Sequence, residues 1–383
     1  MPQPSPYTPG VVAKTVPGRT AQLAFYEERA QLIAQLGQFI GSVRVDYAAR
    51  GVGKTSLLRE AQRVFERHGI ETVWVTAVEG EILAASILEE MRKVLPKTKR
   101  LDELAGLIDS ATITIGGGPV RAGVTIKPAH QKAPAAGKVF MSVVTDVVGA
   151  IREAGGAGLV ILIDEIQAGD KPSLRAVSVA WQELASAKEP PAAGLFSVGL
   201  PGSHDHITSA VTFSERFDFT ELFGIDEGGA ATALYKPAAD IGVTWEQEAV
   251  IAGVKAAQGY PYKVQLVGEG AWVAAGRPDP RGRITLGHVE AGITYVDEKM
   301  RSLFSARWRN ASTKQRELLR AIAVLGGVDV KREDVAAHLG TTTQAISVPR
   351  DRLLSKGIID ATRHGRLSFT VPGFTEYILE HGE

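Results

Sequence analysis

A short glycine-containing segment near the N-terminus carries the residue types that bind phosphate. Residues 48–55 read Ala-Ala-Arg-Gly-Val-Gly-Lys-Thr, which matches the P-loop pattern except that alanine stands at the first glycine. In such a loop, consecutive backbone N–H groups and the start of the following helix wrap the phosphates. Lys54 is expected to neutralise the β and γ phosphates, and the Thr55 hydroxyl to hold Mg²⁺. The predicted ATP contacts are Arg50, Gly51, Val52, Gly53, Lys54, Thr55 and Ser56.

Two adjacent acids, Asp164 and Glu165, follow the apolar run 158–163. An acid at the end of a buried strand needs a cation, and Mg²⁺ beside the loop supplies one for Asp164. Glu165, the next residue, is placed to polarise the attacking water. The alternative interpretation is a glycine loop plus a solvated acidic turn. Both motifs together, each preceded by a strand, favour an ATP site capable of hydrolysis.

Strand and helix patterns alternate around both motifs. Apolar runs predict strands at 43–47, 71–76, 158–163, 194–200 and 217–219, and helical spacing predicts helices at 21–38, 54–68 and 82–94. This alternation predicts an α/β fold with helices on both faces of a parallel sheet. Arg44 and Asp46 interrupt the central strand, and the sequence alone gives no account of how their charges are satisfied.

Residues 112–115 and 120–126 flank three glycines and predict a β-hairpin at the side of the sheet. Its Gly-rich segment is interpreted as a plain turn, because no helix with a free N-terminus follows it. A phosphate-contacting loop is the alternative.

The character of the chain becomes helical after residue 227. Residues 244–247, Thr-Trp-Glu-Gln, look like a capping box opening a helix that Gly259 closes, and a second helix is expected from 262 to 275. Residues 276–282 are rich in Gly and Pro and predict a linker. We therefore expect a P-loop nucleotide-binding domain at 1–226, a helical lid at 227–285 and an α+β winged helix-turn-helix domain at 286–383.

The C-terminal segment has the pattern of a helix-turn-helix followed by a two-strand wing around 363–366. In a DNA-binding interpretation, four residues in the third helix and the segment that leads into it face the major groove, and two wing arginines hold backbone phosphates. They are Thr343, Gln344, Ser347 and Arg350, and Arg363 and Arg366. A winged helix that contacts protein, or acts as a lever, is the alternative.

Composition excludes several classes of protein. Lys+Arg and Asp+Glu both number 43, so the net charge neither supports nor excludes binding to nucleic acid. The absence of cysteine excludes disulfides, thiolate metal sites and cysteine nucleophiles. The sequence shows neither a secretory leader nor a long apolar span, so we expect a cytoplasmic protein without membrane contact. His204 and His206 flank Asp205, but a His-x-His in an irregular loop favours solvated side chains over a metal site.

With these motifs, the chain resembles the AAA+ P-loop ATPases of the origin-recognition initiator group and their bacterial relatives, which overlap with STAND-type signalling ATPases. Residues 17–19, Pro-Gly-Arg, are similar to the Gly-Arg pair that opens these domains near the adenine. The resemblance puts Ser197 at the sensor-one position. It also implies that Arg216 is an arginine finger or an equivalent γ-phosphate sensor, which would involve self-association of the chain.

Residues 259–261, Gly-Tyr-Pro, resemble the Gly-x-Pro element of the STAND lid, which implies that Pro261 packs near the adenine. The initiator group would have an arginine nearby, where this chain offers only Lys263. That departure, together with Ala48, favours a slow switch over a fast motor.

The predicted function is a slowly hydrolysing, Mg²⁺-dependent ATPase whose nucleotide state, ATP or ADP, positions a winged helix on double-stranded DNA. The principal alternative is a STAND-type signalling or scaffold protein that binds protein partners and not DNA. A metal-dependent hydrolase, based on His204 and His206 alone, is remote.

Overall fold

A five-stranded parallel sheet forms the centre of the N-terminal part of the computed structural model, which describes residues 3–95, 101–116, 136–211, 216–361 and 365–382. The strand order is β2-β3-β4-β1-β5. Every residue of β3 and β4 is buried, because helices cover both faces of the sheet. The strands are β1 (Val43–Tyr47), β2 (Ile70–Thr76), β3 (Gly158–Asp164), β4 (Ala193–Gly199) and β5 (Phe217–Glu221).

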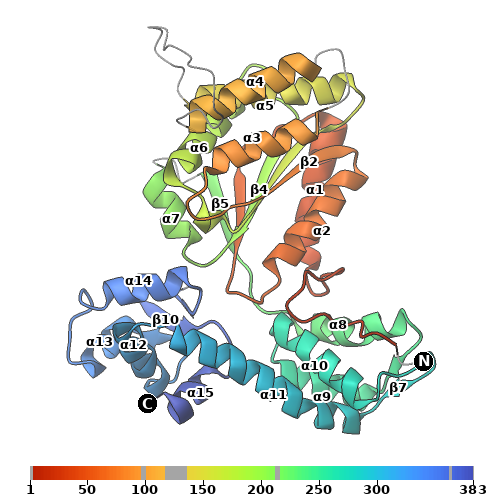
Figure 1. Ribbon diagram of the computed structural model, residues 1–383, viewed down its shortest axis with the longest axis vertical. Coiled ribbons are helices and arrows are strands. Elements are labelled where there is room, and N and C mark those ends of the chain that lie inside the picture. The colour runs from red at the N-terminus through yellow and green to blue at the C-terminus, as the bar shows by residue number, and fades with distance from the viewer. Residues whose placement is uncertain (1–2, 96–100, 117–135, 212–215, 362–364, 383) are drawn as a thin grey trace, which may run out of the picture.

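Two groups of helices sandwich this sheet (Figure 1). Helices α1 (Thr20–Leu36) and α2 (Lys54–Arg67) pack together on one face. Helices α3, α5 and α6 lie on the other face, α4 covers α3 and α5, and α7 packs against α6. Their bounds are α3 (Leu83–Lys93), α4 (Leu101–Gly116), α5 (Ala136–Glu153), α6 (Lys171–Ala185) and α7 (Ser203–Ala210), with a short 3₁₀ turn η1 (Ile166–Ala168) after β3. The predicted α/β sandwich with a parallel sheet is confirmed.

The charged residues of the central strand β1 form a buried cluster. The side chain of Asp46 is fully buried, and it accepts hydrogen bonds from the Tyr26 hydroxyl at 2.6 Å and from Arg44 Nε at 2.7 Å. Arg44 also pairs with Asp218 of β5 at 2.8 Å. Each charge is thus partnered, which is what burial of charge requires, and the cluster joins α1, β1 and β5.

The predicted β-hairpin is wrong in its first half, since residues 112–115 belong to helix α4. Leu104, Ile108 and Ala111 of this helix are almost completely buried. Their spacing of four and three residues is helical, and this packing overrides the local β-propensity of the Thr-Ile repeat. The Gly-rich turn and the second half, 120–126, lie outside the described residues.

The predicted lid region contains three helices and a two-stranded parallel sheet, whose bounds are α8 (Glu227–Ala239), β6 (Thr244–Trp245), α9 (Gln247–Ala257), α10 (Pro261–Ala274) and β7 (Arg283–Ile284). The capping box expected at 244–247 does not form. Its first residues pair with β7, and α9 begins at Gln247 without a side-chain cap. The segment 276–282 therefore leads directly into a strand of the lid.

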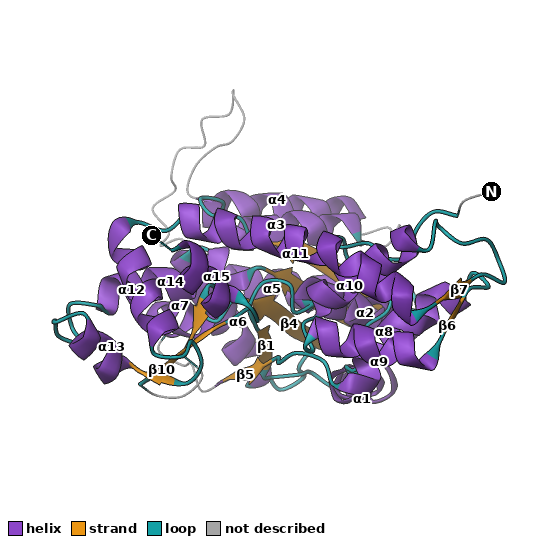
Figure 2. Cartoon of the chain, turned by 90° about the horizontal axis from the view of Figure 1, so that it is seen from below, coloured by secondary structure: helices purple, strands orange, loops and turns teal. Residues whose placement is uncertain are grey.

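Helix α11 (Leu286–Arg309) packs along α10 and continues to the C-terminal elements. These are α12 (Thr313–Val324), β8 (Val330–Lys331), α13 (Arg332–His338), α14 (Ser347–Ser355), β9 (Ile359–Asp360), β10 (Arg366–Phe369) and α15 (Phe374–His381), with the strands in the antiparallel order β8-β10-β9. We call residues 310–382 the C-terminal unit. Figure 2 shows the lid helices and this unit on opposite sides, with α11 between them.

None of the helices in the described ranges combines the length and the apolar character that crossing a bilayer requires.

Candidate nucleotide site

A cavity of about 1020 Å³ lies over the loop that joins β1 to α2. The loop reaches it through two glycines in the left-handed region, Gly51 at φ +85° and Gly53 at φ +92°. Gly53 is also the N-cap of α2, so this helix begins at Lys54 and directs its N-terminus at the cavity. All seven residues predicted to contact ATP, from Arg50 to Ser56, line the cavity.

The Lys54 ammonium is 6% exposed, and its Nζ donates to the carbonyl oxygen of Ala49 at 2.9 Å. Burial lowers the pKa of Lys54 to about 8, against the opposing influence of Glu165 and Asp164. A buried cation whose hydrogen-bond partner is a neutral carbonyl is poorly compensated. An anion in the cavity would remove this cost.

Thr55 and Asp164 meet beside the lysine, where the Thr55 hydroxyl donates to Asp164 Oδ2 at 2.9 Å. Asp164 is 5% exposed, and burial raises the pKa of its carboxyl group. A hydroxyl and a desolvated carboxylate are the oxygen ligands that Mg²⁺ takes next to phosphate. These two residues therefore fit the predicted metal.

Glu165 also lines the cavity. Its backbone is left-handed, at φ +54°, a conformation that is uncommon for a residue with a side chain. Its carboxylate accepts a hydrogen bond from Gln167 Nε2, while Gln167 Oε1 accepts from the backbone N–H of Leu200 at 2.9 Å. Gln167 thus ties the candidate base to the end of β4. Sequence reasoning missed Gln167, although its place two residues after Glu165 was a usable signal.

Two residues assigned through the resemblance lie away from this chain's own cavity. The Ser197 hydroxyl donates to the carbonyl of Arg44 at 3.0 Å and is fully buried within the sheet. Arg216 is exposed and precedes β5, whose first residue pairs with Val43, the first residue of β1. Because the P-loop follows the opposite end of β1, Arg216 lies at the far edge of the sheet.

The lid is hydrogen-bonded directly to the phosphate loop. The Tyr260 hydroxyl donates to the carbonyl of Arg50 at 2.8 Å, and the backbone N–H of Tyr262 donates to the carbonyl of Gly51 at 3.1 Å. Pro261, between them, is in the first turn of α10 and lines the cavity. A Cβ on Gly51 would lie 2.1 Å from the Tyr260 hydroxyl, so this approach requires glycine. Lys263 is outside the cavity lining and bonds Gln258.

An N-terminal segment also lines the cavity, through residues 10–13, 15–17 and 19. Arg19 is 5% exposed, and its Nη2 donates to the carbonyls of Val52 at 3.0 Å and Phe223 at 2.7 Å. This arginine therefore fixes the P-loop to the segment between β5 and α8. The Ala13 N–H donates to the Ser56 hydroxyl at 3.0 Å.

The C-terminal part of the chain completes the cavity wall, which sequence reasoning did not anticipate. The residues are Leu303, Ala306 and Arg307 of α11, and Asn310, Lys356 and Ile358 of the C-terminal unit. They lie some 250 to 300 positions beyond the P-loop in sequence, so no local motif could have indicated them.

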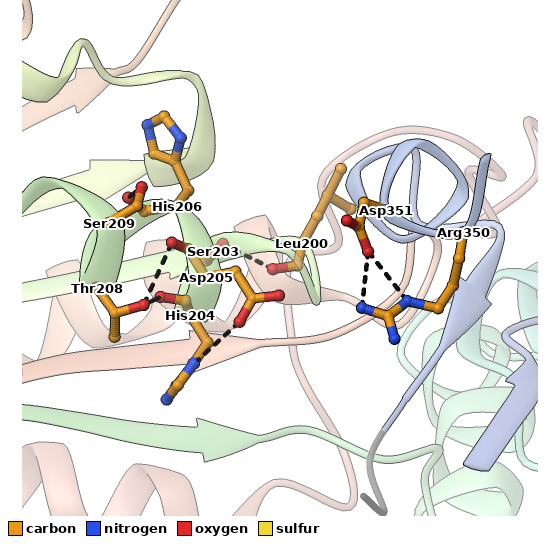
Figure 3. Close-up of polar contacts among 9 residues, drawn as sticks. All are labelled: Leu200, Ser203, His204, Asp205, His206, Thr208, Ser209, Arg350 and Asp351. Atoms are coloured by element: carbon orange, nitrogen blue, oxygen red, sulfur yellow. Dashed lines mark hydrogen bonds and ion pairs between the residues drawn. The ribbon is translucent and has the colours of Figure 1, made fainter. Parts of the chain in front are cut away.

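The residues predicted to bind DNA are only partly free. On α14, Ser347 and Arg350 are half-buried, and Arg350 pairs with Asp351 at 2.7 Å. The Ser347 hydroxyl donates to the carbonyl of Thr343 at 3.1 Å, while Gln344 is exposed. Figure 3 shows Leu200, at the end of β4, between α7 and the Arg350–Asp351 pair. The end of α14 is therefore close to the nucleotide domain, where a Cβ on Gly202 would lie 3.3 Å from Ser355 Cα.

Of the two wing arginines, the structure describes Arg366. Arg366 Nη1 donates to the carbonyl of Asp329 at 2.7 Å and also faces its carboxylate at 3.3 Å. Arg363 lies outside the described residues.

The histidines of α7 diverge, as Figure 3 shows. His206 Nε2 lies 2.7 Å from the carbonyl of Gly169, and the His204 ring packs against Phe219 with centroids 4.5 Å apart. Within the described residues, no three His, Asp or Glu side chains converge as a metal site.

Comparison with known proteins places the chain as follows. Residues 301–378 match the model of a family described as a domain of unknown function, DUF8462. A search of curated proteins finds no match. The structure is similar to that of a Walker-type ATPase of Pyrococcus abyssi, with a TM-score of 0.58, 14% identity and 98% of each chain covered.

It is also similar to the ORC2 protein of Aeropyrum pernix, with a TM-score of 0.57, 14% identity, and 96% of this chain and 95% of that chain covered. At such identities the similarity establishes the fold, and the chain has the α/β fold of P-loop NTPases.

Proposed function

We propose that the chain is an ATPase that binds ATP or ADP with Mg²⁺ over the P-loop and uses a C-terminal winged helix to bind double-stranded DNA. One observation carries the ATPase part: buried Lys54 donates to a neutral carbonyl, beside a Thr55–Asp164 pair suited to Mg²⁺. An anion site and a cation site that adjoin in one cavity are what a magnesium nucleotide requires. The similar ORC2 protein of Aeropyrum pernix was solved as complexes with ADPNP and ADP.

In this proposal Lys54 moves its ammonium from the Ala49 carbonyl to the β and γ phosphates, while the loop N–H groups hold the remaining oxygens. Thr55 and Asp164 hold Mg²⁺, which when bound spreads the phosphate charge. Glu165 polarises the attacking water, and Gln167 keeps its carboxylate oriented. The strained backbone and the tie to Gln167 restrict how Glu165 can move, which favours slow hydrolysis.

The DNA part of the proposal assigns the C-terminal unit as a winged helix. Its support is the order of elements: helices α12, α13 and α14 are followed by strands β9 and β10, and β10 pairs with β8. Thr343, Gln344, Ser347 and Arg350 remain the proposed groove contacts, and Arg363 and Arg366 the proposed phosphate contacts. Because Arg350 and Arg366 are ion-paired, DNA must compete with Asp351 and Asp329 for them.

The second candidate is a STAND-type nucleotide switch that binds protein partners. The observations that favour it are the contribution of the C-terminal part to the cavity and the close approach of α14 to the loop after β4 at Gly202. The proposed domains are 1–226, 227–285 and 286–383, in which α11 packs on the lid and leads into the C-terminal unit. Arg216 is proposed to contact the γ-phosphate bound by a second copy of the chain.

The deciding experiment measures ATP binding and turnover of the wild type, Lys54→Ala and Glu165→Gln, each with and without duplex DNA. We expect Lys54→Ala to lose ATP binding, and Glu165→Gln to bind ATP without turning it over. Normal ATP binding by Lys54→Ala would contradict the nucleotide site. Wild-type turnover by Glu165→Gln would remove Glu165 from catalysis.

DNA binding is tested separately over a range of salt concentrations, with Arg363→Ala combined with Arg366→Ala. If these residues contact phosphates, the double variant should bind more weakly and show a shallower salt dependence. A wild type that binds no duplex at low salt would favour the STAND-type alternative. Measuring the molecular mass with ATP, for the wild type and Arg216→Ala, tests self-association.

A further inference from the structure

Arg307, near the C-terminal end of α11, lines the same cavity as the P-loop. Its guanidinium is close to the Tyr260 hydroxyl, which itself donates to the Arg50 carbonyl. Since Tyr260 also contacts Gly51, only one side chain separates Arg307 from the P-loop backbone. A residue close to the C-terminal unit therefore stands beside the proposed phosphate site.

The partners of Arg307 are neutral or of like charge. They are the Tyr260 hydroxyl, the Thr370 hydroxyl at 3.4 Å from Nη1, and the neighbouring guanidinium of Arg50. Burial lowers the pKa of Arg307, and in the part of the chain that the structure describes no carboxylate pairs with it. Burying a cation without an anion is costly.

Arg44 and Arg19, two other arginines with little exposed surface, behave differently. Arg44 is neutralised by Asp46 and Asp218, and Arg19 donates to two backbone carbonyls that it holds in place. Both have evident structural roles. Arg307 instead faces a cavity with its charge uncompensated, which is the environment that a phosphate group would complete.

A chain of hydrogen-bonding groups runs from the P-loop through Arg307 into the C-terminal unit. Tyr260 joins Arg307 to the Arg50 carbonyl, and Thr370 joins it to the Gly357 carbonyl, to which the Thr370 hydroxyl donates at 2.8 Å. Gly357 follows α14, and a Cβ on it would lie 3.1 Å from Leu200 of the nucleotide domain. A displacement of Arg307 would therefore change the contacts at the place where α14 meets the nucleotide domain.

We propose that Arg307 binds a phosphate of the nucleotide held by the P-loop, and that this contact holds the C-terminal unit docked on the nucleotide domain. The inference rests on the proposed nucleotide site and adds to it the group through which the C-terminal unit responds.

The first test measures binding of ATP and of ADP, with Mg²⁺, to the full chain by calorimetry. Loss of a charge-assisted hydrogen bond to phosphate should weaken binding by about tenfold to a hundredfold in Arg307→Ala. Arg307→Lys, which keeps the charge, should recover part of the affinity. The matched control is Arg309→Ala, since Arg309 is exposed on the same helix and does not line the cavity.

The second test reports docking through a disulfide. Because the chain has no cysteine, Gly202→Cys with Ser355→Cys creates a single pair at the contact between the loop after β4 and α14. ATP should increase the rate of cross-linking in this background. It should have no effect when Arg307→Ala is added, and the usual effect when Arg309→Ala is added.

The outcomes separate the two proposals. Absence of nucleotide binding by the wild type would overturn the proposed function itself. Normal wild-type binding, with Arg307→Ala binding within twofold of it, would overturn the phosphate contact and leave the proposed function standing. Weaker binding by Arg307→Ala with an unchanged ATP effect on cross-linking would overturn the coupling to the C-terminal unit.

Discussion

Replacing Gly51 by alanine tests whether the lid is held against the phosphate loop as the structure has it. Gly51 has φ +85°, and an added Cβ would lie 2.1 Å from the Tyr260 hydroxyl and 2.7 Å from its Cζ. The left-handed backbone alone costs an L-residue about 1–2 kcal/mol. The collision also breaks the hydrogen bond from Tyr260 to Arg50, which adds about 0.5–1.5 kcal/mol.

Gly53→Ala is the matched control, because Gly53 has nearly the same φ, +92°, but no atom within 4 Å of the added Cβ. We expect Gly51→Ala to lower the free energy of unfolding by about 1 kcal/mol more than Gly53→Ala does. Urea denaturation of the nucleotide-free protein, followed by tryptophan fluorescence, measures this difference.

A double-mutant cycle isolates the collision. In a Tyr260→Ala background the extra cost of Gly51→Ala should disappear, because the colliding ring is gone and only the backbone strain is left. Equal destabilisation by Gly51→Ala and Gly53→Ala in the wild-type background would refute the reasoning. It would mean that Tyr260 does not hold the lid on the P-loop.

Three further predictions concern buried charge. The folded-state pKa of Lys54 is about 8, so the unfolded chain binds more protons between about pH 8 and 10; the free energy of unfolding should rise over this range, and a Lys54→Met variant should lack the rise. Burial and Asp360 raise the pKa of Glu221 to about 8, so stability should fall from about pH 5 to pH 8; Glu221→Gln should flatten this part of the curve in the same denaturation assay. Asp46→Ala should cost about 3–5 kcal/mol, because it removes the buried carboxylate that Arg44 and the Tyr26 hydroxyl share and leaves Arg44 only the exposed Asp218, whereas Asp218→Ala, whose carboxylate is exposed, should cost less than about 1 kcal/mol; similar losses in thermal melts would contradict the cluster.

The parts of the site that are contiguous in sequence could be predicted. Lys54 and Thr55 follow a glycine loop, and Asp164 ends an otherwise apolar strand, so the neighbouring residues of each motif indicate the element on which it lies. The parallel sheet then brings the two motifs together, because β1 and β3 both end at the same edge. Arg44 and Asp46 illustrate the limit, since Asp218, which pairs with Arg44, and Tyr26, which donates to Asp46, lie on other elements.

The remaining parts depend on contacts between distant segments. Tyr260 and Arg307 have no motif of their own, and only the packing of α10 and α11 puts them beside Arg50. The repeat at 112–115 shows the opposite failure, in which a local pattern is overridden by the helical packing of α4. Thr244 is similar, because pairing with β7 prevents it from capping α9.

The carbonyl oxygens of the P-loop explain why these distant contacts matter for the proposed nucleotide site. The carbonyls of residues 49–52 each accept a hydrogen bond from a different group. The donors, in order, are Lys54 Nζ, Tyr260 Oη, Tyr262 N and Arg19 Nη2. Because protein donors already satisfy these four carbonyls, the loop can present its N–H groups to a phosphate. Loop geometry in this chain is therefore set by the N-terminal segment and the lid as much as by the glycines, and an alanine at the first glycine position can be tolerated. A nucleotide that draws Lys54 Nζ away from the Ala49 carbonyl would break the first of these four hydrogen bonds. The next one, to the Arg50 carbonyl, comes from the Tyr260 hydroxyl, which also contacts Arg307.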